Sequence, residues 1–374
     1  MAFERDLQSP VKRIGALFRK HMLTHLYFQE HLWKNVMLIC LLVVVAVVSW
    51  LFTWGLRRYA MSRSVIDIPN ERSSHSVPTP RGGGVSIVCC FLTTLPFLAA
   101  SGVLIWSQAF ALLGAGLIVA ILGFLDDHGH IAARWRLLGH FFAGYWLLLF
   151  LGGVPPISLF GATYDLGWLG LFFAVIYLVW LLNLYNFMDG INGIAGVEGV
   201  FVCIGACILY VFSESTVSIF APLFLASAVL GFLLWNFPKA RIFMGDAGSG
   251  FLGIVFGGMS LIAANVSTDL FWGWQILLGV FIVDSTYTLI CRLLRGLRIY
   301  EAHRSHAYQA ASRYYNSHTL VTLAVLTINV VWLLPLALAV ATHHLNGILG
   351  ILIAYVPLLA IAVHFKAGSV KQIS

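Results

Sequence analysis

The sequence predicts an all-α membrane protein, a polytopic bundle of about eleven transmembrane helices with its functional residues in polar connections on one side. Of the 374 residues, 60% are hydrophobic and 10% are charged, and the mean hydropathy is +0.90. Soluble domains carry about 25% charged residues. Long apolar segments recur along the chain, and the basic residues gather in alternate connections between them. Together these observations exclude a water-soluble fold.

Eleven apolar segments approach the length of about 20 residues that a membrane-spanning helix needs. They lie near residues 34–56, 83–106, 108–125, 137–153, 166–183, 190–212, 216–235, 248–265, 272–291, 319–342 and 346–364. The first has no small-residue cleavage site behind it, which indicates a retained span and not a signal peptide. We therefore expect a basic N-terminal extension (1–33), a transmembrane domain (34–366) and a short C-terminal tail (367–374).

The basic residues predict the orientation of the bundle. Of the 22 lysines and arginines, sixteen lie in odd-numbered connections or the C-terminal tail, none in even-numbered connections and six in or beside the N-terminal extension. Cytoplasmic loops are enriched in such residues, so the odd connections should be cytoplasmic and the N-terminus outside. The basic residues of the N-terminal extension contradict an outside N-terminus, and three explanations are open. Later spans override the extension, or it lies on a membrane surface as an amphipathic helix, or the span count is off by one near the start.

The net charge of +7 has two interpretations, nucleic acid binding or a membrane surface. Because the basic residues lie beside predicted spans, they are typical of loops that face the anionic cytoplasmic lipid surface. We expect no nucleic acid partner.

Carboxylates and side-chain amides cluster in three of the odd connections. They are Asp126 and Asp127 in GFLDDHGHI, Asn183, Asn186 and Asp189 in NLYNFMDGING, and Asp246 in IFMGDAGSG. A carboxylate at the membrane edge is costly and is a functional candidate by default. Mg²⁺ prefers oxygen ligands and is commonly held by one or two carboxylates together with substrate phosphates. The pattern therefore predicts a site for a divalent cation and phosphate.

A structural role competes with this interpretation at one position. Asp246 precedes a predicted helix and could simply cap it. Asp126 and Asp127 end a helix, where the helix dipole disfavours a carboxylate, so capping of their own helix explains them poorly. Gly245, next to Asp246, would let backbone N–H groups approach a phosphate, although glycine is also frequent at membrane helix contacts.

Two further odd connections carry candidate residues. In the ninth, RLLRGLRIYEAHRSHAYQAASR, His303, Arg304 and His306 could bind a diphosphate, whereas its other arginines are interpreted as ordinary basic loop residues. In the first, a glycine triplet follows Arg81 and indicates close approach to a ligand or to a helix. Asp284 lies inside the ninth span, and its role is undecided.

The motifs in this order resemble the polyprenyl-phosphate N-acetylhexosamine-1-phosphate transferase family, or glycosyltransferase family 4. That family includes the enzyme for the first lipid intermediate of peptidoglycan and those that initiate O-antigen and N-glycan lipids. The match runs from about Asn70 to Arg313. It implies a cytoplasmic site in the bacterial inner membrane that uses Mg²⁺, with Mn²⁺ as an alternative. It also implies sugar-phosphate transfer from a UDP-N-acetylhexosamine to undecaprenyl or another polyprenyl phosphate, with release of UMP. A homodimer stays open.

The resemblance also implies roles for single residues. Asp126 and Asp127 look like the catalytic pair that activates or orients the lipid phosphate, and Asn186 and Asp246 like the metal ligands. The residues that look like substrate-binding positions are Arg81, Asn183, Asp189, Asn192, Asn236, Phe243, His303, Arg304 and His306. Among these, Phe243 is expected to stack on uracil.

Three departures favour the O-antigen-initiating branch over the peptidoglycan branch. The peptidoglycan branch usually has Lys at the position of His130, Asp at that of Asn192 and a run of histidines in place of H-R-S-H. The sugar stays open. Two rivals predict other features: a transporter predicts ionisable residues near the midplane, paired broken helices and internal repeats. A CDP-alcohol phosphatidyltransferase predicts D-G-x-x-A-R, which the sequence lacks.

Overall fold

The computed structural model describes residues 10–69, 77–129, 131–159, 162–215, 219–297 and 303–369. Side chains are described within these ranges from residue 36 onward, except at 158 and 159. His130 and residues 1–9 of the N-terminal extension lie outside the described residues.

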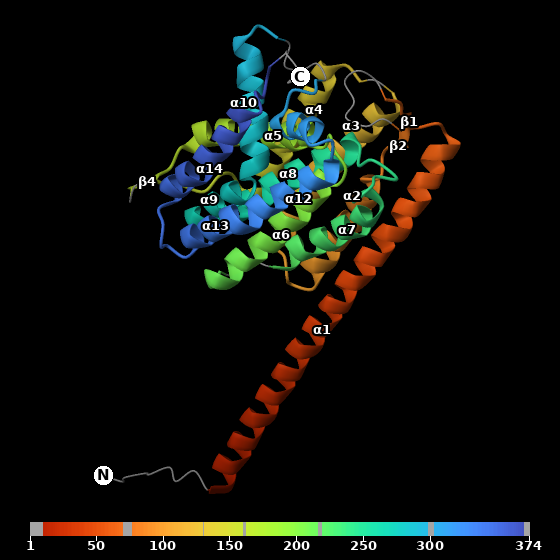
Figure 1. Cartoon of the computed structure of the whole chain (residues 1–374). Coiled ribbons are helices and arrows are strands. Elements are labelled where there is room, and N and C mark those ends of the chain that lie inside the picture. Colours follow the sequence, from red (N-terminus) through yellow and green to blue (C-terminus); the bar gives the residue numbers. More distant parts are fainter. Residues whose placement is uncertain are drawn as a thin grey trace. The chain divides into compact units, whose positions relative to one another are not determined.

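Helices dominate the described chain and its strands are two or three residues long, so the all-α prediction is confirmed (Figure 1). The elements are α1 (Pro10–Ser62), β1 (Ile66–Asp67), β2 (Thr79–Pro80), α2 (Val85–Ala100), α3 (Trp106–His128), α4 (Ala133–Leu151), β3 (Ile157–Leu159), β4 (Ala162–Tyr164), α5 (Gly167–Met188), α6 (Ile194–Phe212), α7 (Phe220–Asn236), α8 (Asp246–Ala264), α9 (Thr268–Leu277), α10 (Gly279–Leu294), α11 (Ala307–Tyr314), α12 (His318–Ile328), the π-helical turn η1 (Asn329–Leu333), α13 (Leu334–Ala341) and α14 (Gly347–His364). Contacts divide the chain into two units, residues 1–44 and 45–374.

Seven described helices are long and apolar enough to cross a membrane, and the number rises to eight if one bent pair counts as a span. Two further apolar helices, α2 and α7, are shorter. The predicted span at 137–153 corresponds to α4, which begins four residues earlier, at Ala133, and is not among the seven. Its first turn contains Arg134 and Arg136, and both charges lower its hydropathy.

The ninth predicted span, 272–291, is not one straight helix. It consists of α9 and α10, which meet at Leu278 with a bend of 70°. Gly279 follows the bend and lies against Leu333, Tyr355 and Leu358, where a side chain would lie in tight contact with all three. The turn η1 and helix α14 can therefore pack closely at the point where the span turns.

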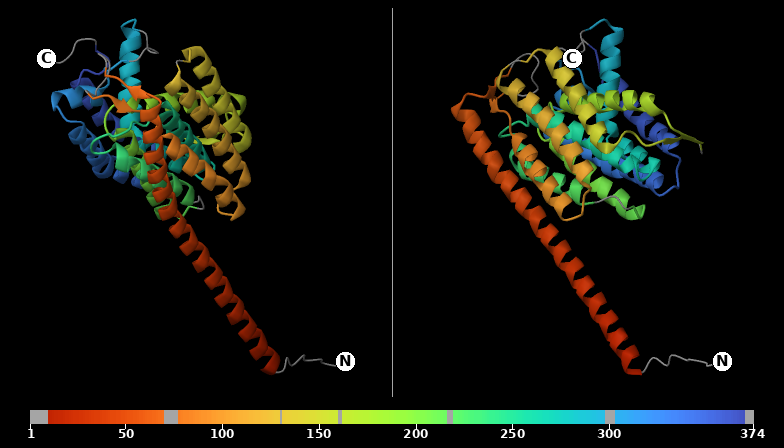
Figure 2. Two further views of the ribbon diagram at one scale, coloured as in Figure 1. Left: turned by 90° about the vertical axis from the view of Figure 1, so that its right-hand side faces the viewer. Right: turned by 180° about the vertical axis from the view of Figure 1, so that it is seen from behind.

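Helix α8 forms the centre of the larger unit. Every residue from Ala247 to Ala263 is buried, and α3 and α5 pack along it (Figure 2). Small residues allow this close packing, as is usual where membrane helices meet. Gly253 lies against the backbone of Leu182 on α5, and Gly123 of α3 lies against Ala247. The first turn of α8 is consequently fixed between the C-terminal ends of α3 and α5.

A second carboxyl group lies inside a span besides Asp284. Glu198 on α6 is fully buried and accepts a hydrogen bond of 2.5 Å from the side-chain amide of Asn329. Asn329 begins the π-helical turn between α12 and α13. The sequence analysis singled out Asp284 as a carboxylate inside a span and did not single out Glu198.

Candidate active site

Asp127 binds the N-terminus of α8. Its Oδ1 accepts the backbone N–H of Asp246 at 3.1 Å and its Oδ2 that of Ala247 at 3.4 Å. The side chain is only 1% exposed and also pairs with Arg81 at 2.6 Å. Gly245 precedes the helix at φ +78, and a Cβ there would meet the Asp127 carboxylate, so glycine suits both the backbone and the space. Asp127 thus caps a helix 119 residues away in the chain.

Asp126 points to a different partner. Its carboxylate accepts the backbone N–H of Ile131 at 2.9 Å and forms a short ion pair with Arg136 on α4. The side chain is 8% exposed. Because both of its oxygens are engaged, Asp126 fixes Arg136 and the turn between α3 and α4.

Asp246 is the most exposed of the three carboxylates, with 27% of its side chain accessible. Its Oδ1 lies 3.5 Å from Arg81 and its Oδ2 lies 3.4 Å from Arg136. Asn186 of α5 donates to Asp246 at 3.2 Å and to Ser249 at 3.0 Å. Two arginines therefore flank one accessible carboxylate that an amide also contacts.

A cavity of about 150 Å³ opens beside this group, between α3, α4, α5 and α8. Its polar lining includes Arg136, His140, Asn183, Asn186 and Asp246. Val119, Leu137, Leu182 and Phe187 supply an apolar wall. A charged phosphate and an apolar chain could both be accommodated at such a boundary.

The first connection reaches the site through its backbone. Strands β1 and β2 pair, and the N–H of Phe243 donates to the carbonyl of Pro80 at 2.8 Å. Gly83 and Gly84 donate to the carbonyls of residues 243 and 244 at 2.9 and 2.8 Å. The sequence analysis left two alternatives for the glycine triplet, close approach to a ligand or to a helix. The structure shows the second, because Gly84 also lies against the backbone of Gly248 in α8. This places Arg81 beside Asp127 and Asp246.

Electrostatics follow from this arrangement. Burial alone would lower the pKa of Arg81, but the carboxylates of Asp127 and Asp246 outweigh burial and raise it, so the guanidinium stays charged. Burial and the same two carboxylates raise the pKa of Asp189 well above its ordinary value.

Asn183 lies in the cavity wall and donates to the carbonyl of Val179 in its own helix at 2.6 Å.

Residues 192–193 and residues 236–243, two segments distant in sequence, meet through hydrogen bonds. Asn236, which is buried, donates to the carbonyl of Ile242 at 2.9 Å and accepts the N–H of Gly193 at 2.9 Å. Asn192 donates to the carbonyl of Pro238 at 3.4 Å. Phe243 is half-buried directly after this segment. The structure therefore brings together three of the predicted substrate-binding residues, Asn192, Asn236 and Phe243.

The His303–His306 segment meets the site through Phe187. The ring of Phe187 lies 6.3 Å from that of His303 and 6.2 Å from that of His306, and the two histidines stack at 4.9 Å. Burial, with His306 and Arg292 nearby, lowers the pKa of His303 to about 3. His303 is consequently neutral near pH 7.

The site offers hard oxygen donors to a cation but is not a ready-made ligand cage. Among the residues that the structure describes, no three His, Cys, Asp or Glu side chains form a metal-binding group. Asp246 and Asn186 present carboxylate and amide groups 3.2 Å apart. This donor set fits Mg²⁺, which keeps several waters and needs few protein ligands.

The sequence analysis did not predict the roles of two residues of the site. Arg136 was counted only as a basic loop residue, although it contacts both Asp126 and Asp246. Its spacing of ten residues from Asp126 gives no periodic signal, because a turn separates α3 from α4. Asp284 was left undecided, and the structure shows that it binds the backbone at the start of α11.

Comparison with known proteins supports a family of transferases. A family model described as "Glycosyl transferase family 4" matches residues 109–264, from α3 to α8. The chain is 27% identical over 301 residues to a "Probable undecaprenyl-phosphate N-acetylglucosaminyl 1-phosphate transferase" of Bacillus subtilis (strain 168), covering 78% of this chain and 83% of the relative.

Two further relatives carry the names of two different transferases. An "Undecaprenyl-phosphate alpha-N-acetylglucosaminyl 1-phosphate transferase" of Thermotoga maritima is 26% identical, covering 72% of this chain and 80% of the relative. A "Phospho-N-acetylmuramoyl-pentapeptide-transferase" of Bacillus pumilus is 28% identical, with coverages of 71% and 85%. These comparisons support the polyprenyl-phosphate N-acetylhexosamine-1-phosphate transferase family, and the chain is a glycosyl-1-phosphate transferase.

Proposed function

We propose that this protein transfers an N-acetylhexosamine-1-phosphate from a UDP-sugar to undecaprenyl or another polyprenyl phosphate and releases UMP, in a reaction that depends on Mg²⁺. The observation that carries the proposal is the convergence of Asp126, Asp127 and Asp246 with Arg81 and Arg136 beside a cavity with one apolar wall. Such a group suits two phosphorylated substrates, one of which is a lipid. The names of two relatives favour N-acetylglucosamine as the sugar.

Asp246 and Asn186 are the residues that would hold the cation. When bound, Mg²⁺ neutralises charge on the phosphates and supports departure of UMP. Asp127 maintains the first turn of α8 so that the carboxylate of Asp246 faces the cavity. Mn²⁺ is the alternative cation.

The protein's own side chains supply positioning and positive charge, which account for most of the catalysis in phosphoryl transfer. Arg81 and Arg136 flank the cavity, and Arg304 follows in the His303–His306 segment. A lipid phosphate has a second pKa near 6, so it is largely ionised at pH 7 and needs no strong base. Asp126 already binds Arg136 and Ile131. We therefore assign Asp126 an orienting role in place of proton abstraction.

The donor nucleotide is proposed to bind where Asn192, Asn236 and Phe243 meet. Phe243 offers a ring for stacking on uracil, and Asn192 offers an amide at the rim. Asn236 holds the Gly193 and Ile242 backbone with its own amide, so it shapes the pocket. Asn183 and Asp189 lie toward the diphosphate and sugar.

We place the protein in a bacterial inner membrane, with the site facing the cytoplasm and the N-terminus outside. The distribution of basic residues supports this orientation. The product would be the first lipid intermediate of O-antigen or a related cell-surface polysaccharide. Association as a homodimer belongs to the same proposal.

The deciding experiment measures UMP release by the purified full chain with undecaprenyl phosphate and Mg²⁺. We expect release with UDP-GlcNAc or a related UDP-N-acetylhexosamine, and none after chelation by EDTA. UDP-MurNAc-pentapeptide is included because one relative carries that activity in its name. Turnover with that donor alone would refute the proposed sugar class, and no turnover with any donor would refute the function.

Arg136 provides a first prediction. Replacing Arg136 with Gln should lower kcat/KM about 10²-fold, the usual cost of removing one preorganised charge donor. The matched control is Arg134→Gln, two residues earlier on α4, where the guanidinium is exposed and lies 5.6 Å from the Trp135 ring. We expect the control to retain wild-type kinetics. Equal losses of kcat/KM in both variants would contradict a specific role of Arg136, because the loss would then follow from removing any positive charge in the first turn of α4.

A further inference from the structure

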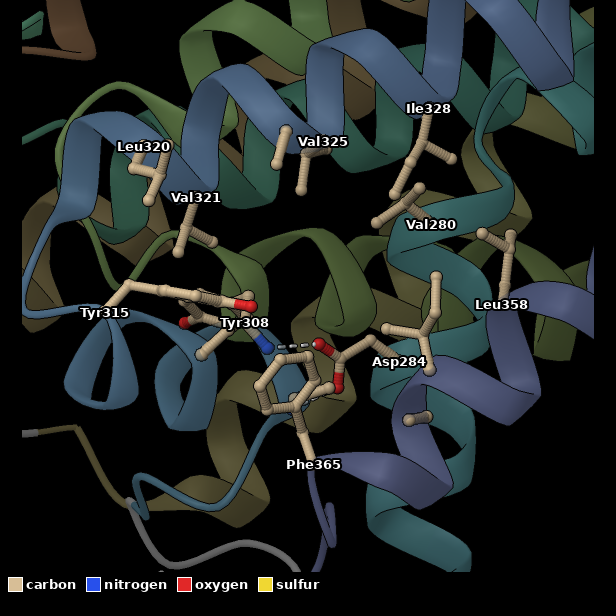
Figure 3. Close-up of a pocket in the computed structure, with 15 residues that line it drawn as sticks. Val280, Asp284, Tyr308, Tyr315, Leu320, Val321, Val325, Ile328, Leu358 and Phe365 are labelled. Carbon is tan, nitrogen blue, oxygen red and sulfur yellow. Dashed lines mark hydrogen bonds between the residues drawn. The ribbon is translucent and has the colours of Figure 1, made fainter.

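Asp284 binds the start of α11, the short helix that follows the His303–His306 segment. Its Oδ1 accepts the N–H of Ala307 at 2.9 Å and its Oδ2 accepts that of Tyr308 at 2.9 Å (Figure 3). Thr288, one turn further along α10, donates to Oδ1 at 3.1 Å. Asp284 is 6% exposed. A buried carboxylate at a helix N-terminus is favourable because both the free N–H groups and the helix dipole attract it.

Tyr308 connects the same helix to the catalytic cavity. Its hydroxyl donates to the carbonyl of Phe187 at 2.9 Å. Phe187 lines the cavity that Asn186 and Asp246 share, and its ring contacts both histidines of the segment. The position of α11 therefore determines where the segment lies relative to that cavity.

A turn near the C-terminus binds the segment from another side. The N–H of Gly368 donates to the carbonyl of Ser305 at 2.8 Å, and its own carbonyl accepts Arg295 at 2.7 Å. Gly368 has φ +75, a conformation that favours glycine. The end of α10 and the segment are thus joined through one residue 63 positions beyond Ser305.

These polar contacts matter because α11 is not closely packed on all sides. A cavity of about 470 Å³ adjoins it, lined by residues of α10, α12 and α14 that include Val280, Val325 and Leu358 (Figure 3). Close packing restricts a helix to one position, and on the side of this cavity α11 lacks such contacts. The polar contacts of Asp284 and Tyr308 therefore contribute to its placement, together with the packing of its buried face.

We propose that Asp284, Tyr308 and Gly368 are positioning residues that hold the His303–His306 segment against the catalytic cavity. The proposal rests on the proposed function, in which Arg304 of this segment supplies positive charge to the phosphorylated substrates. A displacement of about 1 Å in a group that orients substrate can cost about 10²-fold in rate. The anchors should therefore govern use of the nucleotide sugar and leave the lipid acceptor unaffected.

The test replaces Asp284 with Asn, which keeps the size but turns one acceptor oxygen into a donor facing a backbone N–H. We expect kcat/KM for the nucleotide sugar to fall about 10²-fold, while the KM for the lipid phosphate stays within about twofold. Amide hydrogen exchange over residues 303–314 should be faster in the variant. Tyr308→Phe and Gly368→Ala, which each weaken one other anchor, should change the same parameters in the same direction, by about tenfold or more.

The matched control is Glu198→Gln, another buried carboxyl group in a membrane helix, which contacts Asn329 and not the segment. It should leave both kinetics and exchange over 303–314 unchanged. Wild-type kinetics in Asp284→Asn, equal effects on donor and acceptor, or unaltered exchange would each overturn the proposal. If Asp284→Asn does not fold, the other two variants decide. If the wild type releases no UMP, the proposed function is refuted. Amide hydrogen exchange over residues 303–314 in the variants still shows whether Asp284, Tyr308 and Gly368 fix the position of the His303–His306 segment.

Discussion

Replacing Asp246 with Asn is expected to lower kcat about 10³-fold without lowering the melting temperature. Removal of a single preorganised electrostatic group costs up to that factor. In the proposed reaction this carboxylate holds the cation, and it is the most accessible of the three, with 27% of its side chain exposed between Arg81 and Arg136. Asparagine keeps the shape and one oxygen but removes the charge. The concentration of Mg²⁺ needed for half-maximal activity should therefore rise as well.

The matched control for Asp246 is Asp269→Asn. Asp269 also lies in the first turn of a helix, α9, but its partner is the exposed His343 at 2.7 Å. We expect wild-type kcat and Mg²⁺ dependence in this variant. If Asp246→Asn retained activity within tenfold of the wild type, the assignment of the metal site would be wrong.

Asp127→Asn should reduce both stability and activity. The carboxylate caps α8 through two N–H groups and pairs with Arg81, and its side chain is 1% exposed. Loss of a helix cap costs about 1–2 kcal/mol, and an arginine left without its partner adds to this. We expect unfolding to become easier by about 2 kcal/mol or more, together with a kcat decrease because Asp246 moves with the first turn of α8.

Thermal unfolding in detergent and kcat measured on the same preparation test this prediction. Asp165→Asn is the control, since Asp165 also accepts an N–H at a helix start, that of Gly167 at 3.0 Å, but is exposed and distant in sequence from the motifs. Its melting temperature should change little. An unchanged melting temperature in Asp127→Asn, combined with lost activity, would indicate direct contact with substrate instead of a capping role.

The contrast between Asp126 and Asp127 marks the limit of sequence reasoning. Adjacent carboxylates at one helix end suggested a single function for both. The structure separates them: Asp126 binds Arg136 of the next helix, whereas Asp127 binds the N-terminus of α8. Helix capping was judged a weak explanation because their own helix ends there, and the helix that Asp127 caps begins 119 residues later.

Hydropathy and the order of the motifs predicted the all-α membrane fold, the resemblance to the family and the segments that meet at the site. Hydropathy and the spacing of motifs are local properties, so they can be read from the sequence without a structure. The pairing of Arg136 with Asp126, the bend between α9 and α10, and the contact of Asp284 with α11 could not be predicted from the sequence and are seen only in the tertiary structure. Each depends on which helix ends lie side by side, and close packing around the buried, glycine-rich α8 sets that arrangement.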